Sequence, residues 1–253
     1  MPGVAPALTA AHRRRLREMW RSAGWPCRDA IEVDLLAAGL LVRIFDAAGR
    51  ETLRVTDAGV AQLAATLQRN RAAYDAHEAL VARVAEAMQR EGRIVWRGLS
   101  LRAALPPAPA PGDAAPTPAV RWVMAMPDVF SIRNTTVETY VEPAVHEIKV
   151  RRADLLADLR RPDKGAAYRA ICSQCWYVLG PGVGDADDVP DEFGVLLAAA
   201  EGTALALARP APRRAMTLPF AAWMALARGH AEPPPDEAQQ PLRDGEAPVD
   251  PPA

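Results

Sequence analysis

Hydrophobic positions in the first 70 residues follow a helical period on both sides of a short alternating stretch. Residues 9–23 carry apolar side chains three to four positions apart after Thr9, a good helix N-cap, and residues 28–38 continue in this way up to Gly39. Two apolar runs, 40–45 and 51–55, flank turn residues and predict a β-hairpin. A helix over residues 56–70 is expected to close this N-terminal segment, residues 1–72.

The pattern changes after residue 72, where helical and strand-like runs alternate. A helix is predicted over 74–91 and a strand over 93–97, followed by a Pro/Ala-rich insert at 105–118 that suits neither element. Strands are predicted over 120–132 and 144–150, and a helix over 152–160. Apolar runs at 175–179, 194–199 and 203–208 are typical of further strands. Residues 73–212 are therefore expected to form an α/β domain of sandwich type.

Residues 213–253 form a third segment with a different composition. One amphipathic helix is predicted over 217–228, and the proline and acidic residues after it predict disorder. The chain has a net charge of −1, but residues 229–253 hold one basic and six acidic residues, so the body is mildly basic. With no run near the ~20 apolar residues of a membrane span and no leader-like start, we expect a cytoplasmic protein without a membrane partner.

The positions of the cysteines and lysines limit the kinds of chemistry that the chain is expected to carry. Cys172 and Cys175 form a CxxC, but no second pair completes a zinc site, so small buried side chains are the favoured interpretation. Of the 30 basic residues only Lys149 and Lys164 are lysines. Arginine serves wherever positive charge suffices, which suggests that both lysines occupy positions that need a compact ammonium.

The candidate chemistry lies on the strands at 120–132 and 144–150. Alternation places Glu147 and Lys149 on one face of the second strand, with Ile148 and His146 on the other. If the two strands are neighbours, Asp128 approaches Glu147, and the two carboxylates with the backbone carbonyl of Ile148 form an all-oxygen site suited to Mg²⁺. Such an ion, with Lys149 beside it, matches the needs of phosphodiester hydrolysis. The plainer alternative is a solvated strand face, because Glu-x-Lys alone is common.

The residues Pro127-Asp128 and Glu147-x-Lys149 resemble the signature of the PD-(D/E)XK nuclease superfamily. More specifically, the chain resembles the MmcB family of DNA repair proteins within that superfamily. The motifs that carry this second resemblance are KVRRADLLAD at 149–158, RPDK at 161–164, Tyr168, CWYVL at 175–179 and VPDEFGV at 189–195. It covers residues 74–210.

The resemblance implies a restriction-endonuclease-like core, which is a mixed sheet flanked by helices. It also implies DNA as substrate and Mg²⁺ as cofactor, with Mn²⁺ as a substitute. It also implies an additional acid from the first helix, for which Glu78 and Glu86 are candidates, and places Lys164, Tyr168 and Gln174 along the phosphate path, where each could equally be a satisfied polar group. Asp154 and Asp158, four positions apart on the following helix, are expected to make surface ion pairs with Arg151 and Arg161.

The N-terminal segment resembles winged-helix DNA-binding proteins in the residues AGLLV at 38–42 and LRVTDAG at 53–59. The basic face of its first helix is then a candidate DNA contact, formed by Arg13, Arg14, Arg15, Arg17 and Arg21. One helix fewer precedes the hairpin than is usual, so a packing or dimerisation module, and hence a homodimer, is the alternative.

The function expected from the sequence is a metal-dependent DNA nuclease in DNA repair or in mobile-element processing. A non-catalytic DNA-binding or regulatory protein on the same scaffold is the alternative. A third hypothesis is an interaction module of a mobile element whose acidic tail binds a basic partner or screens the DNA surface.

Overall fold

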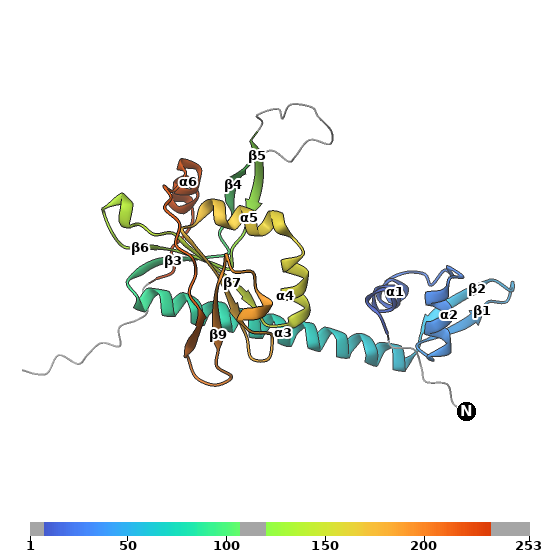
Figure 1. The fold of residues 1–253 in the computed structure, drawn as a ribbon. Coiled ribbons are helices and arrows are strands. Elements are labelled where there is room, and N and C mark those ends of the chain that lie inside the picture. Colours follow the sequence, from blue (N-terminus) through green and yellow to red (C-terminus); the bar gives the residue numbers. More distant parts are fainter. Residues whose placement is uncertain (1–7, 107–119, 234–253) are drawn as a thin grey trace, which may run out of the picture. The chain divides into compact units, whose positions relative to one another are not determined.

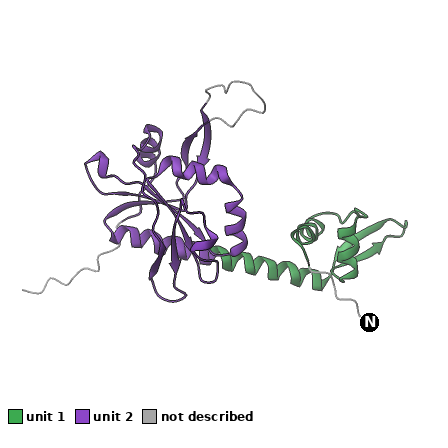
Figure 2. Cartoon of the chain, viewed as in Figure 1, with its two compact units in different colours: residues 1–74 green, residues 75–253 purple. Residues whose placement is uncertain are grey.

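The computed structural model describes residues 8–106 and 120–233, which belong to two compact units (Figures 1 and 2). The first unit lies within Met1–Tyr74 and the second within Asp75–Ala253. Most of the Pro/Ala-rich insert and the predicted disordered tail, residues 107–119 and 234–253, lie outside the described residues. No helix in the described part of the chain is long and apolar enough to cross a membrane.

The first unit contains the predicted helices and hairpin. Helix α1 (Ala10–Arg21) is capped by the hydroxyl of Thr9, which accepts the N–H of His12, and is followed by α2 (Ala30–Ala37). Strands β1 (Leu41–Phe45) and β2 (Glu51–Val55) pair antiparallel. Leu16, Leu35 and Leu53 meet in a small core between these elements. The unit is thus a small helical and hairpin module.

Helix α3 (Asp57–Arg90) corrects the prediction of two helices at 56–70 and 74–91. It is one continuous helix of 34 residues. The residues between the two predicted segments, Arg-Ala-Ala at 71–73, contain neither glycine nor proline, and both residue types have high helix propensity. Nothing in the local sequence therefore ends the first helix before the second begins.

The second unit is built on a six-stranded mixed sheet in the order β10-β9-β8-β7-β6-β3 (Figure 1). Pairing is parallel between β7 and β8 and between β8 and β9, and antiparallel elsewhere. The strands are β3 (Arg93–Arg97), β6 (Val129–Arg133), β7 (Ala144–Lys149), β8 (Gln174–Leu179), β9 (Gly194–Ala198) and β10 (Leu205–Arg209). Strands β6 and β7 are neighbours, which was the condition for bringing Asp128 to Glu147.

The predicted strand at 120–132 is two strands in two different sheets. Strand β5 (Arg121–Ala125) pairs with β4 (Leu101–Leu105), a strand that was not predicted, in a separate two-stranded sheet. Strand β6 then starts at Val129 within the main sheet. The chain leaves one sheet for the other at Pro127, which has no N–H to donate to a ladder.

Helices cover both faces of the main sheet. The second half of α3 packs Leu80 and Val84 against Ile148 and Val178 on one face. The other face is covered by α5 (Pro162–Ile171), the β4–β5 hairpin and α6 (Phe220–Arg228), while α4 (Arg152–Leu159) follows β7. Two short 3-10 turns lie at Glu138–Tyr140 and Ala186–Asp188. Helix α5, which positions part of the site, was not predicted.

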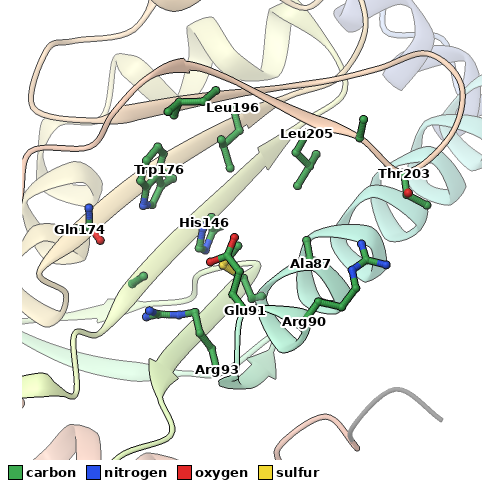
Figure 3. A pocket seen from close by; sticks show the side chains of 14 residues that line it. Ala87, Arg90, Glu91, Arg93, His146, Gln174, Trp176, Leu196, Thr203 and Leu205 are labelled. Carbon is green, nitrogen blue, oxygen red and sulfur yellow. The ribbon is translucent and has the colours of Figure 1, made fainter. Parts of the chain in front are cut away.

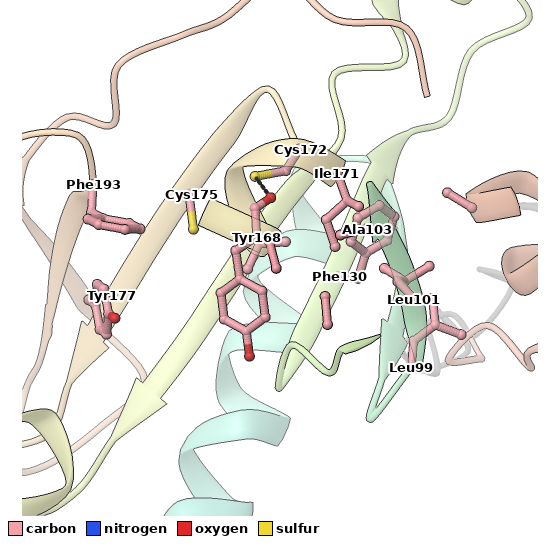
Figure 4. Packing of buried hydrophobic residues seen from close by; sticks show 14 of the residues in the cluster. Leu99, Leu101, Ala103, Phe130, Tyr168, Ile171, Cys172, Cys175, Tyr177 and Phe193 are labelled. Atoms are coloured by element: carbon pink, nitrogen blue, oxygen red, sulfur yellow. Dashed lines mark hydrogen bonds between the residues drawn. The ribbon is translucent and has the colours of Figure 1, made fainter. Parts of the chain in front are cut away.

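The two cysteines of the CxxC are small buried side chains, as expected. Both are free and buried in the core beneath α5 (Figure 4). The thiol of Cys172 donates to the carbonyl of Tyr168 at 3.0 Å. Nearby, Tyr177 and Phe193 pack edge to face with ring centroids 5.2 Å apart, which closes this side of the core.

Candidate active site

Asp128 and Glu147 lie at the same end of the β6–β7 ladder. The last pair in the ladder is Val129 opposite His146, so Asp128, one residue before β6, falls at the level of Glu147. The carboxylate of Asp128 accepts the backbone N–H of Ile148 at 2.7 Å. The side chain therefore extends the ladder beyond the last backbone pair, and this hydrogen bond fixes the carboxylate beside β7.

Alternation along β7 places Glu147 and Lys149 on one face and Ile148 and His146 on the other, as the sequence predicted. Ile148 is buried against α3, whereas Glu147 and Lys149 point to the other face, toward α4 and α5. Lys149 Nζ donates to Glu147 Oε1 at 2.6 Å. Glu147 and Lys149 are only 4 % and 9 % exposed, which excludes the alternative that they form a solvated strand face.

Two further charged residues complete a buried network around Glu147. Lys164 Nζ, from α5, lies 2.6 Å from both Glu147 Oε1 and Asp158 Oδ1. Lys149 Nζ also lies 3.3 Å from Asp158 Oδ2, which accepts the hydroxyl of Tyr177 at 3.1 Å. Two ammonium groups thus face two carboxylates, which compensates the burial of Glu147, Lys149 and Asp158, while Lys164 is partly exposed.

The burial of Asp158 corrects its interpretation as half of a surface ion pair. Its side chain is 6 % exposed and faces the two lysines. Leu155 and Asp158, three positions apart on α4, share the buried face of the helix, whereas Asp154 is exposed. The helical spacing was visible in the sequence, but the cations that face Asp158 come from other elements.

Burial and nearby charges shift the pKa values of Asp128 and Asp158 in opposite directions. Burial, together with the nearby charge of Glu147, raises the pKa of Asp128, and the N–H of Ile148 only partly offsets this rise. Burial also favours neutral Asp158, but Lys164 and Lys149 outweigh it and lower the pKa of that carboxyl. Asp158 is therefore satisfied by its protein partners, whereas the nearby charge of Glu147 disfavours the ionised form of Asp128.

The oxygen atoms around Asp128 fit a hard divalent cation. Glu147 Oε2 is buried and has no hydrogen-bond partner among the described residues. Because the N–H and C=O of a strand residue point the same way, the carbonyl of Ile148 is directed to the side on which its N–H meets Asp128. Within the described ranges no three His, Cys, Asp or Glu side chains cluster to hold a metal, so two carboxylates and this carbonyl form the available set. Mg²⁺ commonly binds one or two carboxylates and keeps waters.

The residue of α3 that reaches this site is His77, which the sequence did not indicate. His77 Nε2 lies 3.4 Å from Asp128 Oδ1, and its Nδ1 lies 3.2 Å from Glu78. Of the two candidate additional acids, Glu78 is thus linked to Asp128 through His77. Glu86 instead forms an exposed i,i+4 pair with Arg90 at 3.0 Å. The identity of the residue at this point of α3 depends on the rotation of the helix, which a periodic pattern does not fix.

The three residues expected along the phosphate path are separated by the fold. Lys164 belongs to the buried network, and Tyr168, one turn further along α5, donates its hydroxyl to the carbonyl of Met126 at 2.9 Å. Gln174 is not brought to the site. It begins β8, opposite Ala144, whereas the site lies at the opposite end of β7, and its side chain donates to the carbonyl of Ala211 at 3.3 Å.

The five arginines of α1, in the first unit, differ in whether their guanidinium groups already have a partner. Arg13 donates to the carbonyl of Leu8 at 2.6 Å, and Arg15 lies 2.9 Å from Asp29. Arg14, Arg17 and Arg21 are exposed, and the nearest carboxylate oxygen to Arg14 is that of Glu18 at 3.9 Å. Three of the five guanidinium groups are therefore available to an external anion.

The network predicts how Asp158 contributes to stability at different pH values. Because folding lowers its pKa, its stabilisation is expected in full above about pH 4, the ordinary pKa of an aspartate, and to be lost as the pH falls through the lower folded value. The measurement is the difference in free energy of unfolding between wild type and Asp158→Asn, in urea, from pH 7 down to pH 3. A difference that stays constant over this range would contradict the paired geometry.

Comparison with known protein families, with characterised proteins and with experimentally determined structures found no match to this chain. The class of protein must therefore be argued from the arrangement of residues itself. What the fold defines is an α/β protein with a six-stranded mixed sheet flanked by helices, preceded by a small helical and hairpin module.

Proposed function

We propose that this chain is a metal-dependent deoxyribonuclease of the PD-(D/E)XK type, acting in DNA repair or mobile-element processing. One observation carries the proposal: Asp128 is held at the level of Glu147 by the N–H of Ile148, with Lys149 on the same face as Glu147. A mixed sheet between helices, with the acids at the end of two central strands, agrees with a restriction-endonuclease-like core. The winged-helix-like first unit would hold the DNA.

Each residue has a distinct task in this proposal. Asp128, Glu147 and the carbonyl of Ile148 would hold Mg²⁺ or Mn²⁺, which supplies Lewis-acid polarisation of the phosphoryl oxygen and a water of lowered pKa. Lys149 stabilises the charge that develops on the phosphoryl group and orients the attacking water. Lys164 donates to both Glu147 and Asp158 and fixes the position of Glu147.

The proposal is tested by cleavage with the purified full-length chain. Supercoiled plasmid, single-stranded DNA and branched DNA are incubated with Mg²⁺, with Mn²⁺, or with EDTA. We expect cleavage of at least one substrate with a divalent ion and none with EDTA. Failure to cleave any of the three with either ion would reject the nuclease assignment.

A second function, non-catalytic DNA binding, is favoured by a different observation. Lys149 and Lys164 both contact the same oxygen of Glu147, a closed network that can serve stability alone. In that case the exposed arginines of α1 carry the function, and the core of the second unit is a scaffold. Variants of the two units separate these functions, because they alter different measurements.

Replacing Arg14, Arg17 and Arg21 together by alanine is expected to weaken DNA binding and make it less sensitive to salt. Each phosphate contact contributes about 0.9 to the slope of log K against log salt, so losing three contacts lowers the slope by about 3. Fluorescence anisotropy with a labelled duplex at several salt concentrations measures this. As a control, Arg169→Ala removes an arginine that pairs with Glu192 at 2.6 Å and should leave the slope unchanged. An unaltered slope in the triple variant would exclude α1 as a DNA contact.

A further inference from the structure

A cavity of about 600 Å³ lies on the face of the sheet opposite Glu147 and Lys149 (Figure 3). Its walls come from the last turns of α3, from β7, β8 and β9, and from the β9–β10 segment. Apolar side chains form most of its surface, among them Met88, Trp176, Leu196, Leu205 and Leu207. Its volume falls within the range of small-molecule sites, and neither the nuclease proposal nor its residues use it.

One polar side chain stands out in this apolar wall. His146 is 2 % exposed and lines the cavity, and its Nδ1 has no hydrogen-bond partner among the described residues. Buried polar atoms without a partner are rare because their lost hydration is not replaced, and a ligand polar group in the cavity would supply the missing partner.

The surroundings of His146 limit the shape of such a ligand. The rings of His146 and Trp176, on paired positions of β7 and β8, are nearly parallel, with an interplanar angle of 7° and centroids 6.2 Å apart. Flat rings prefer offset stacking on a surface of this kind. Leu196 and Leu205 also line the space and add apolar surface to it. A flat ring therefore fits better than a sugar or a peptide.

The polar groups around the cavity limit its chemistry. The ring nitrogens of His146 can form hydrogen bonds with a ligand. Arg93 also lines the cavity, held in place by hydrogen bonds to Ser131 Oγ at 2.8 Å and to the carbonyl of Glu142 at 2.5 Å, and its charge favours a carbonyl oxygen. The charge of Arg93 is already offset by the nearby carboxylates of Glu91 and Glu142, and Arg90 pairs with Glu86 at 3.0 Å. An uncharged ligand is therefore favoured over an anion.

We propose that this cavity binds an uncharged planar heteroaromatic ring with adjacent N–H and C=O groups, of the size of a nucleobase or nucleoside, through His146 and Trp176. The ring lies along the wall formed by Trp176, its N–H or its ring acceptor pairs with the imidazole, and its carbonyl faces Arg93. Because the site is on the other face of the sheet from Asp128, the proposal is independent of DNA cleavage.

The test measures binding of uracil and hypoxanthine to the full-length chain by isothermal titration calorimetry without metal or DNA. 1,3-Dimethyluracil keeps the ring and the carbonyls of uracil but has no N–H, so we expect at least about tenfold weaker binding, the loss of one well-placed hydrogen bond. His146→Phe keeps an aromatic ring of similar size and removes the unpartnered nitrogen, and the same loss is expected. Leu205→Trp fills the cavity and should also weaken binding.

Control measurements keep the outcomes distinct. Thermal melting verifies that each variant is folded, and His146→Phe is expected to melt no lower than wild type because it removes a buried unsatisfied atom. Trp122→Ala removes an exposed indole on β5 and should leave binding unchanged. The proposal is overturned if neither base binds folded wild type at low millimolar concentration. Binding that persists in both cavity variants, or that disappears only in Trp122→Ala, overturns it as well.

Discussion

Replacing Asp128 by asparagine is expected to reduce metal-dependent DNA cleavage at least about a hundredfold, the effect of removing one group that stabilises transition-state charge. Asparagine keeps an oxygen that accepts the N–H of Ile148, so the local geometry should remain. The ionised form of Asp128 is disfavoured in the folded chain by burial and by Glu147, as its raised pKa shows. The variant is therefore expected to be as stable as wild type or more stable, with activity and stability changing in opposite directions.

Two measurements and one control check this expectation. Calorimetric titration with Mn²⁺ should show binding to wild type that is lost in Asp128→Asn, and urea unfolding should show no loss of stability. Glu192→Gln, a half-exposed acid paired with Arg169, is the matched control and should cleave as wild type does. Equal cleavage by wild type and Asp128→Asn would refute the role of Asp128 as a metal ligand.

Replacing Asp158 by alanine is expected to destabilise the second unit by about 3 kcal/mol, at the lower end of the range for breaking a buried ion pair. The change removes the acceptor of Lys149, Lys164 and the Tyr177 hydroxyl, and leaves two ammonium groups facing Glu147 alone. The lower end applies because the Lys164 side chain is 28 % exposed and regains some hydration.

Urea unfolding at neutral pH, followed by circular dichroism, measures this loss as a shift of the midpoint. Asp163→Ala is the matched control: it removes an aspartate on the adjacent helix whose partner, Arg121, is on the surface, and no measurable change is expected. Replacing Lys164 by methionine and Asp158 by leucine in one variant should recover part of the lost stability, because two neutral side chains can be buried without a partner of opposite charge. A loss no larger than that of the control would show that the network adds no stability.

The sequence anticipated the local elements better than their assembly. The strand at 93–97 and the helix at 152–160 agree with the structure within a residue, because their periodicity is strong and their ends are marked by glycine or charged residues. The two errors, a helix break at residues 71–73 and a single strand at 120–132, lie where the local sequence gives no clear signal. Residues 71–73 contain no helix breaker, and the 120–132 run is mostly apolar although its first part pairs with β4 and its second part with β3 and β7.

Part of the candidate site could likewise be recognised from the sequence, and part of it could not. Asp128, Glu147 and Lys149 were recognisable because two of them share one strand and the third carries a Pro-Asp signature. Asp158 and Lys164 reach the same buried point from two helices, and His77 approaches from a third. These contacts depend on how the helices pack on the sheet, so the spacing of residues in the sequence does not predict them.

By itself the sequence determined the alternation that puts Glu147 and Lys149 on one face of a strand, since that depends only on the pleat of the backbone. The tertiary structure alone decided that Asp128 lies at the level of Glu147 and that Gln174 is at the far end of the next strand. It also decided that His146 lines a cavity, with an Nδ1 that has no hydrogen-bond partner among the described residues. Strand register, strand direction and helix packing are set by contacts between residues far apart in the chain. Local patterns carry little of that information.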